Sequence, residues 1–187
     1  NRGASPINFA IINGEEKTGA TTIFIHEKID AGNILLQEEL PISPDENAGS
    51  LHDRLMEMGA KLVVKTLDGL AENSITEQPQ PQVAEPKNAF KIFKEDTRIN
   101  WNQETKKVHN FIRGMSPYPC AFTSLKVGDE IKGLKIFAGN FEISHHQNEA
   151  GTLEIAKNVF KIYTKDGFYS PTEVQLEGKK RMNVKDF

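Results

Sequence analysis

The sequence has 187 residues, enough for one large domain or two small ones, and its 37% hydrophobic and 26% charged residues are typical of globular proteins. No apolar run approaches the roughly 18 residues of a membrane span, and we expect neither a signal peptide nor contact with a membrane. The single cysteine, Cys120, excludes an intrachain disulfide and favours a reducing, cytoplasmic location. Because the sequence begins with Asn1 rather than methionine, we expect it to be a processed or truncated chain.

The net charge of −3 is distributed unevenly along the sequence. Residues 1–86 carry 6 basic and 14 acidic side chains, a balance of −8, whereas residues 87–187 carry 17 basic and 12 acidic side chains, a balance of +5. Such an asymmetry suggests two units, and the basic unit is a candidate for contact with nucleic acid. Charge alone does not establish that contact, because this excess is common by chance.

A short helix and two strands are predicted at the start of the sequence. Ser5-Pro6 is typical of the first residues of a helix, and Gly14 of its end. β-Branched and aromatic residues predict strands over residues 20–27 and 33–40. Asp30 lies at the tip of the turn that joins these strands.

A longer helix is predicted to begin at Asn47 or Ser50 and to fray near Glu72. On one side of it, residues recur at steps of three and four, which predicts a face packed on a sheet. They are Leu51, Leu55, Met58, Leu62, Thr66 and Leu70.

The composition changes after residue 74. The run Gln78-Pro79-Gln80-Pro81-Gln82 favours extended backbone, so residues 75–90 are predicted to be a linker between two domains. A helix over residues 103–115 is expected next. Short apolar stretches then alternate with glycine-containing turns, at residues 122–127, 134–141, 151–156, 159–164, 167–169 and 173–176. Strands at this spacing predict a small β-barrel or sandwich.

Asp30 is the acidic residue best placed to form a site. It lies in a short turn between two apolar strands, and Gly32 allows the backbone there to approach a ligand closely. A partly desolvated carboxylate in this position would orient an imidazole and raise its pKa. Ordinary turn chemistry, in which the side chain bonds to nearby backbone, explains the pattern more simply.

The histidines favour structural interpretations. His26 is expected to be a partly buried strand residue, and His52 and His109 to be partners of nearby charges. His145-His146 has no acidic or thiol ligand at metal spacing, so we expect no metal site.

Three further residues are interpreted in the same way. Cys120 follows a proline among apolar residues and is expected to be a buried, unreactive thiol. Tyr118 and Phe122 are expected in the core rather than as platforms for nucleotide bases. No glycine-rich phosphate-binding loop is present.

The order of several short motifs is more specific than any single residue. In chain order they are Arg2-Gly3-Ala4-Ser5-Pro6-Ile7, Gly14-Glu15, Thr18-Gly19-Ala20-Thr21-Thr22, Asp30-Ala31-Gly32-Asn33-Ile34, Arg98-Ile99-Asn100-Trp101, Val108-His109-Asn110-Phe111-Ile112-Arg113-Gly114, Pro117-Tyr118-Pro119 and Ala121-Phe122. Together they resemble the 10-formyltetrahydrofolate-dependent formyltransferases over nearly the whole chain. Gly178-Lys179-Lys180-Arg181-Met182 is similar to the closing pattern of the family members that act on methionyl-tRNA. Cys120 departs from the family, in which glycine is usual at this place.

The resemblance implies an α/β fold followed by a β fold. Residues 1–74 would form the C-terminal part of a Rossmann-like formyltransferase domain, residues 75–90 a linker, and residues 91–187 an OB-like β-barrel that binds tRNA. The full-length enzyme is expected to be a monomer, whereas this part of it, with apolar surface uncovered, is expected to self-associate.

The resemblance also implies the reaction, which is transfer of a formyl group from 10-formyltetrahydrofolate to the amino group of methionyl initiator tRNA, without a metal. Asp30 corresponds to one catalytic residue of the family, and the catalytic Asn and His would precede Asn1, so we expect residues 1–187 alone to be inactive. The residues expected to contact tRNA are Lys87, Lys91, Lys94, Arg113, Lys179, Lys180 and Arg181. Two alternatives are a sugar-nucleotide formyltransferase and a non-catalytic RNA-binding module.

Overall fold

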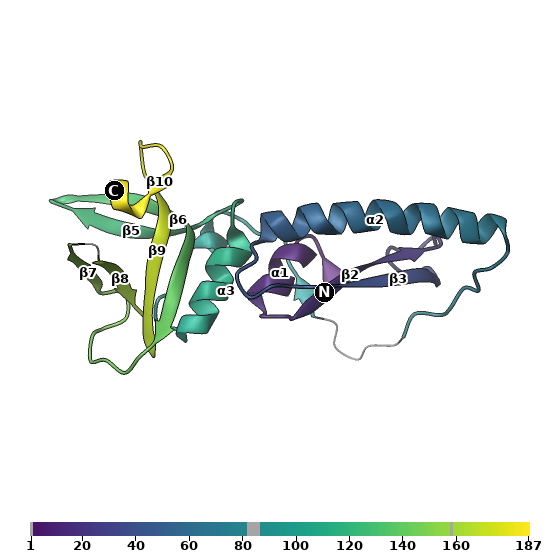
Figure 1. Ribbon diagram of the computed structural model, residues 1–187, viewed down its shortest axis with the longest axis horizontal. Helices are drawn as coiled ribbons and strands as arrows, with labels where there is room; N and C mark the ends of the chain where they lie inside the picture. Colours follow the sequence, from purple (N-terminus) through teal and green to yellow (C-terminus); the bar gives the residue numbers. More distant parts are fainter. Residues whose placement is uncertain (1, 82–86, 158) are drawn as a thin grey trace.

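The computed structural model describes residues 2–81, 87–157 and 159–187. Two parts lie next to each other along the long axis of the molecule (Figure 1). One part contains helices α1 and α2 and the hairpin of β2 and β3, and the other contains helix α3 and the strands β5 to β10. No helix in the described ranges is long and apolar enough to cross a membrane.

The hairpin pairs β2 (Lys17–Ile23) with β3 (Ile34–Pro41) in antiparallel register. The predicted bounds of β3 are confirmed to within one residue, but the prediction for β2 is three residues late at its start and four at its end. Lys17 pairs with Pro41, so the ladder extends into residues of weak strand propensity. These residues are strand because the partner strand bonds to them, and not because of their own side chains. The register shifts between Thr22 and Ile23, and β2 ends there.

Helix α1 (Pro6–Ile12) begins and ends close to the predicted residues, although the Ser5 side chain makes no capping bond. Helix α2 (Ala48–Ala71) begins after Asn47, whose side chain accepts a hydrogen bond from the Ser50 amide at 3.0 Å. This contact decides between the two predicted start residues.

The predicted apolar face of α2 is buried against the hairpin and α1. Leu51 is 0% and Leu62 2% exposed, and the Thr66 hydroxyl lies 2.9 Å from that of Thr22 on β2. The other side of α2 exposes a second set of apolar side chains, namely Met56, Val63, Val64 and Leu67. Helix α2 therefore has apolar side chains on two sides, and the described residues cover only one of them.

The segment after α2 is fixed to the hairpin rather than free. The Ile34 amide donates to the Gln78 carbonyl at 2.7 Å, and the Gln78 amide donates back to Ile34 at 2.8 Å. Further along, β4 (Asn88–Ala89) pairs in parallel with β1 (Arg2–Gly3). A side chain at Gly3 would place its Cβ 2.1 Å from the Ala89 carbonyl oxygen, so this pairing requires glycine.

The second part contains one antiparallel sheet packed on α3 (Thr105–Met115), with short 3₁₀ turns at Glu95–Thr97 and Val184–Asp186. Its strands are β5 (Ala121–Val127), β6 (Glu130–Ile143), β7 (Leu153–Ala156), β8 (Val159–Tyr163), β9 (Gly167–Leu176) and β10 (Met182–Asn183). They follow the order β5-β6-β9-β8-β7, with β10 beside β9, and the sheet curls (Figure 1). A closed barrel would need bonds between β5 and β7, and none joins them in the described residues.

Two stretches that the sequence predicts as separate strands form the single strand β9, in which Pro171 lies opposite Gly139. The β6–β9 register is irregular around Ala138 and Gly139, so the ladder accommodates a residue without an amide hydrogen. The core of this part lies between α3 and the sheet. Its buried members are Ile99, Val108, Ile112, Met115, Ala121, Leu134, Ile136, Ile162, Tyr169 and Val174.

Candidate functional site

Asp30 lies in the loop between β2 and β3, and its side chain is exposed. Its backbone has a φ of 55°, which is uncommon for a residue other than glycine. The loop is held from both sides: the Phe24 amide donates to Asn33 at 3.1 Å, and Gln80 Nε2 donates to the carbonyls of Asp30 and Gly32 at 2.8 and 2.7 Å. These contacts fix the backbone and leave the carboxylate directed to solvent, without a hydrogen bond from any described residue.

The environment of Asp30 differs from the sequence-based interpretation in two respects. The carboxylate is exposed rather than partly desolvated. His26 is exposed rather than partly buried, and its Nδ1 accepts a hydrogen bond from the Lys28 amide at 3.1 Å. The strand that was expected to bury it ends at Ile23. The imidazole of His26 is therefore hydrogen-bonded to the backbone of the same loop, and not to the carboxylate of Asp30.

Asp30 does not line either of two cavities that open on the described surface. The smaller has a volume of about 460 Å³ and lies beside β2, between Pro6, Thr18, Gly19 and Lys87. Lys87 forms an ion pair with Glu15 at its rim. This lysine is thus held against the first part of the chain.

The larger cavity is a groove of about 770 Å³ in the second part. Its walls come from the segment before α3, the loop after α3 and the strands β5, β6 and β9. Lining side chains include Phe93, Lys94, Tyr118, Phe122, Lys132, Lys135 and Glu177. The prediction that Tyr118 is in the core is wrong, because the residue is 83% exposed.

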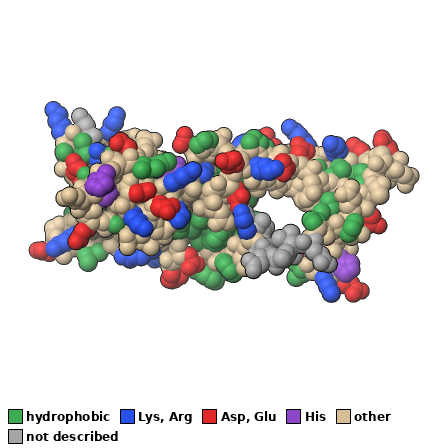
Figure 2. Space-filling view, turned by 90° about the horizontal axis from the view of Figure 1, so that it is seen from below, with side chains coloured by type: hydrophobic (Ala, Val, Ile, Leu, Met, Phe, Trp, Pro, Cys, Tyr) green, Lys and Arg blue, Asp and Glu red, His purple; other side chains and the backbone are tan. Residues whose placement is uncertain are grey.

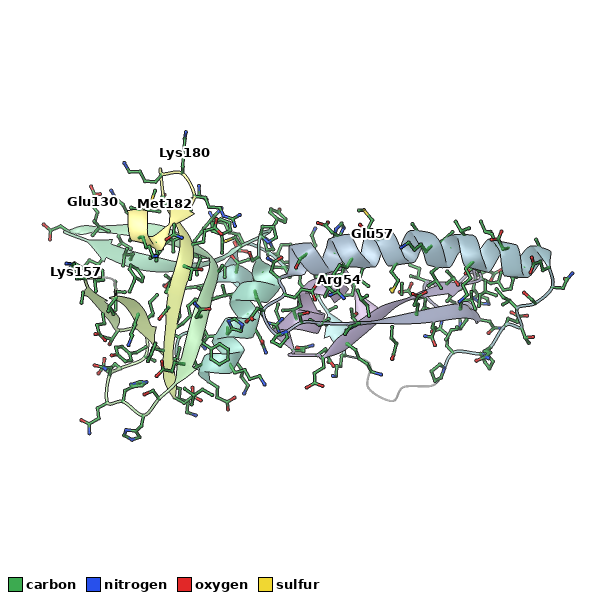
Figure 3. All side chains as sticks on the ribbon, viewed as in Figure 1. Arg54, Glu57, Glu130, Lys157, Lys180 and Met182 are labelled. Atoms are coloured by element: carbon green, nitrogen blue, oxygen red, sulfur yellow. The ribbon has the colours of Figure 1, made fainter. Side chains whose placement is uncertain are left out.

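The remaining predicted basic residues lie around this groove or at the surface near it. Lys94 lines the groove, and the ammonium of Lys91 lies 5.3 Å from the centre of the Phe93 ring. Lys179 and Lys180 are exposed in the turn between β9 and β10, and the side chain of Lys180 projects away from the body of the molecule (Figure 3). Gly178 of the same turn lines the groove, so these lysines adjoin it.

Arg181 is engaged in intramolecular contacts. It donates two hydrogen bonds to Glu173, at 2.5 and 2.6 Å, and its guanidinium lies 4.1 Å from the centre of the Phe137 ring. The bond to Glu173 raises the pKa of Arg181. The charge of Arg181 is thus largely compensated by Glu173.

Arg113 is the predicted tRNA contact that the structure places least well for that role. It is only 8% exposed and lies at the contact between the two parts of the chain. Its Nη1 donates to the Glu46 carbonyl at 2.9 Å and to that of Ser43 at 3.4 Å, and its Nε donates to Asn110 at 3.0 Å. A guanidinium held in this way joins the two parts and has little surface to offer a phosphate.

His109 lies beside Arg113 and is also buried, at 6% exposure. Its ring is 4.7 Å from that of Phe141, and its Nε2 is 3.9 Å from an Asp45 carboxylate oxygen, beyond hydrogen-bonding distance. Burial, and then the charge of Arg113, lower the pKa of His109. Burial and Arg113 therefore favour the neutral imidazole, and the charges of Arg113 and Asp45 beside the ring agree with the prediction that His109 lies near charged partners.

Sequence reasoning missed the lysines of β6. Lys135 alternates with the buried residues Leu134 and Ile136, so strand periodicity would have placed it on the outer face.

On the face drawn in Figure 2, basic and acidic side chains are intermixed over both parts. No group of three His, Cys, Asp or Glu residues suited to a metal ion occurs within the described ranges.

Comparison with known proteins connects this geometry with a family. The family model described as "Formyl transferase, C-terminal domain" matches residues 91–187, and that described as "Formyl transferase" matches residues 1–67. The chain belongs to the formyltransferase family. As the motifs indicated, it contains sequence from both the N- and C-terminal domains of that family.

Individual relatives agree with this assignment. The chain is 45% identical over 183 residues to a methionyl-tRNA formyltransferase of Flavobacterium johnsoniae, covering 98% of this chain but 58% of that protein. The structure of HypX from Aquifex aeolicus with tetrahydrofolic acid superposes with a TM-score of 0.70 at 21% identity, over 97% of this chain and 32% of that one. An N-formyltransferase from Helicobacter canadensis, solved with folinic acid and dTDP-3-aminofucose, gives a TM-score of 0.66 at 20% identity, over 97% and 62%. These structural likenesses show a shared fold.

Proposed function

We propose that this chain is part of a methionyl-tRNA formyltransferase, which transfers a formyl group from 10-formyltetrahydrofolate to the amino group of methionyl initiator tRNA. The supporting observation is the 45% identity to a methionyl-tRNA formyltransferase across 98% of the chain. The N-formyltransferase solved with dTDP-3-aminofucose matches at 20% identity, which supports a shared fold and not a shared substrate. We further propose a cytoplasmic location and a monomeric full-length enzyme.

The domain organisation forms part of the proposal. Residues 1–74 would complete a Rossmann-like formyltransferase domain, residues 75–90 would link it to the next, and residues 91–187 would form an OB-like domain. An OB fold is a partly open five-stranded barrel, and the curled order β5-β6-β9-β8-β7 is compatible with one. Residues 82–86 of the linker lie outside the described residues.

In the proposed reaction, the α-amine of the methionyl group attacks the formyl carbon. A tetrahedral intermediate forms, the bond from that carbon to N10 of the folate breaks, and the proton lost by the amine is balanced by one gained at N10. Asp30 would accept a hydrogen bond from an imidazole and hold it in position to move these protons. The family resemblance assigns this imidazole, and an Asn that stabilises the oxyanion, to a segment preceding Arg2-Gly3.

This assignment predicts that residues 1–187 alone transfer no formyl group. An oxyanion donor contributes about 10²–10³-fold to a rate, and positioned acid–base catalysis about 10²–10⁴-fold. The exposed and unbonded carboxylate of Asp30 is consistent with a site that needs further groups. Formyl transfer by the purified 187-residue chain at the rate of an intact enzyme would refute the assignment.

The basic surface of the second part would contact the phosphates of the tRNA. We assign this role to Lys91, Lys94, Lys179 and Lys180, and also to Lys87 and Arg181, which are paired with Glu15 and Glu173 and would have to leave these partners. We omit Arg113 because it is buried. Reversing the charges at Lys179, Lys180 and Arg181 together should weaken binding of initiator tRNA and reduce its dependence on salt. The matched control is Lys65→Glu on α2, which also reverses an exposed charge but lies on the other part.

The experiment that tests the substrate class compares three probes with the same protein. Gel-shift or anisotropy measurements should show binding of initiator tRNA, with weaker binding of an elongator tRNA. Calorimetry with a dTDP-linked amino sugar should show no binding. The reverse pattern would favour a sugar-nucleotide formyltransferase, whereas equal binding of every RNA would favour a non-catalytic RNA-binding module.

A further inference from the structure

The larger cavity is lined by exposed aromatic rings and by lysines. Packing of the hydrophobic core does not explain why these rings are at the surface. Tyr118 is 83% and Phe93 56% exposed, although large aromatic side chains are normally covered in a folded domain. Both line the same groove of about 770 Å³. Exposed rings that converge on one cavity indicate a surface that binds a flat partner.

Tyr118 is presented on a rigid loop. It lies between Pro117 and Pro119, and proline restricts both its own backbone and that of the residue before it. The loop is closed by the Cys120 amide, which donates to Met115 at 2.8 Å, and is joined to α2 by the Gly49 amide, which donates to Ser116 at 3.1 Å. Because the loop is already ordered, little conformational entropy is lost when a ligand stacks on the ring.

The charges around the groove favour an anion. Lys94, Lys132 and Lys135 line it, against the single carboxylate of Glu177. That carboxylate accepts a hydrogen bond from the Gly133 amide at 3.0 Å, which compensates part of its charge. Lys132 is paired with Glu130 at 2.8 Å, whereas Lys94 and Lys135 form no ion pair with a described residue.

We propose that this groove binds unpaired nucleotides of RNA, with a base stacked on Tyr118 and the adjoining phosphates near Lys94 and Lys135. The proposal rests on the proposed function and goes beyond it by naming the nucleic-acid structure that one site recognises. A single-stranded segment offers the face of a base to the ring and a phosphate to each lysine. An A-form duplex keeps its bases stacked inside, so it would meet the lysines but leave Tyr118 without a partner.

The test uses the 187-residue chain and two probes, labelled octaadenylate and a blunt-ended RNA duplex with the same total number of phosphates. Tyr118→Ala should weaken octaadenylate binding by about five- to a hundredfold, the effect of losing one stacked base. Duplex binding should not change. Tyr118→Phe should restore octaadenylate binding, because it retains the ring. Phe24→Ala removes another exposed ring as a control, from the loop between β2 and β3 in the other part of the molecule.

Charge-reversal variants separate base stacking on Tyr118 from the electrostatic attraction between lysines and phosphates. Lys94→Glu and Lys135→Glu should weaken both probes, whereas Lys65→Glu on α2 should weaken neither. The proposal is overturned if the wild-type chain does not bind octaadenylate, or if Tyr118→Ala leaves that affinity unchanged. It is also overturned if the variant weakens duplex and single strand equally while its circular dichroism spectrum matches the wild type.

These outcomes are distinguishable from failure of the proposed function. If initiator tRNA binds but octaadenylate binding is insensitive to Tyr118, the groove assignment is wrong and the substrate assignment stands. If octaadenylate binds through Tyr118 while initiator tRNA has no advantage over other RNA, the groove assignment stands and the substrate assignment is wrong.

Discussion

Replacing Arg113 by alanine is expected to weaken the contact between the two parts of the chain. The guanidinium is 8% exposed and donates to the Glu46 carbonyl at 2.9 Å and to the Asn110 side chain at 3.0 Å, with a longer bond of 3.4 Å to Ser43. Alanine would remove all three bonds, and the acceptors of the two shorter ones would be left in a cavity that is largely closed to water.

The size of the effect follows from these contacts. A hydrogen bond from a charged donor contributes about 1.5–3 kcal/mol, so two of them have a gross value of about 3–6 kcal/mol. Burial opposes this gain and lowers the pKa of Arg113, which shows that the buried charge has a desolvation cost. We therefore expect the free energy of unfolding to fall by about 3 kcal/mol in Arg113→Ala, the lower end of that gross value, because the acceptors left without a partner are neutral oxygens.

Urea denaturation followed by circular dichroism measures this loss. Arg113→Lys keeps the charge without the planar fork and should lose an intermediate amount. Lys65→Ala, an exposed charge on α2, should change stability by less than about 0.5 kcal/mol. If Arg113→Ala cost under about 1 kcal/mol and instead weakened tRNA binding, the residue would be a phosphate contact, as predicted from the basic residues of the second half of the sequence.

Three other residues give predictions that denaturation also checks. Burial and Arg113 hold the pKa of His109 below 6.5, so the unfolded chain binds this proton at a higher pH than the folded chain does. The free energy of unfolding should therefore be largest above pH 6.5 and fall at lower pH. His109→Phe should flatten that dependence. Thr105 donates two hydrogen bonds of 2.7 Å to Asp166, which lower the carboxyl pKa below 3.8. Asp166→Ala should therefore cost about 1 kcal/mol at neutral pH, and the cost should disappear as acid protonates the carboxylate through its lowered pKa. Cys120 has a φ of 75°, so Cys120→Gly should be more stable than Cys120→Ala, the reverse of the usual order, by up to about 1 kcal/mol. Equal stability of these two variants, or a pH profile unchanged by His109→Phe or Asp166→Ala, would contradict the respective reasoning.

The elements that local pattern determines were predicted well from the sequence. Steps of three and four residues identified α2, and Asn47, which caps the helix, was one of the two start residues that the sequence offered. Strand β3 was placed to within one residue, because its own side chains carry the strand signal. In each case, the information lies in residues that are close in sequence.

The errors arise where distant residues decide the structure. β2 extends back to Lys17 because Pro41 of the partner strand pairs with it, and β9 continues through Pro171 because the opposite strand is irregular there. The same holds for Arg113 and Tyr118. A helix pattern does not show that Arg113 meets the Glu46 carbonyl, and a Pro-Tyr-Pro motif does not show that the ring of Tyr118 faces outward.

Asp30 and the groove belong to different parts of the molecule: Asp30 lies in the loop between β2 and β3, and the groove is formed by the part that contains α3 and the sheet. The β2–β3 hairpin extends away from that sheet (Figure 1). An RNA that presented its amino acid near Asp30 while stacking on Tyr118 would have to extend along the molecule. The rigidity of the connection between the two parts would then decide how accurately the reacting amine is placed. In this structure that connection includes a buried bond from Arg113 to Glu46, a part-buried bond of 2.8 Å from Asn8 to Gly114 and the backbone bond from Gly49 to Ser116, and is not made by the linker alone. Loosening these contacts should therefore affect positioning of the amine more than affinity for the RNA.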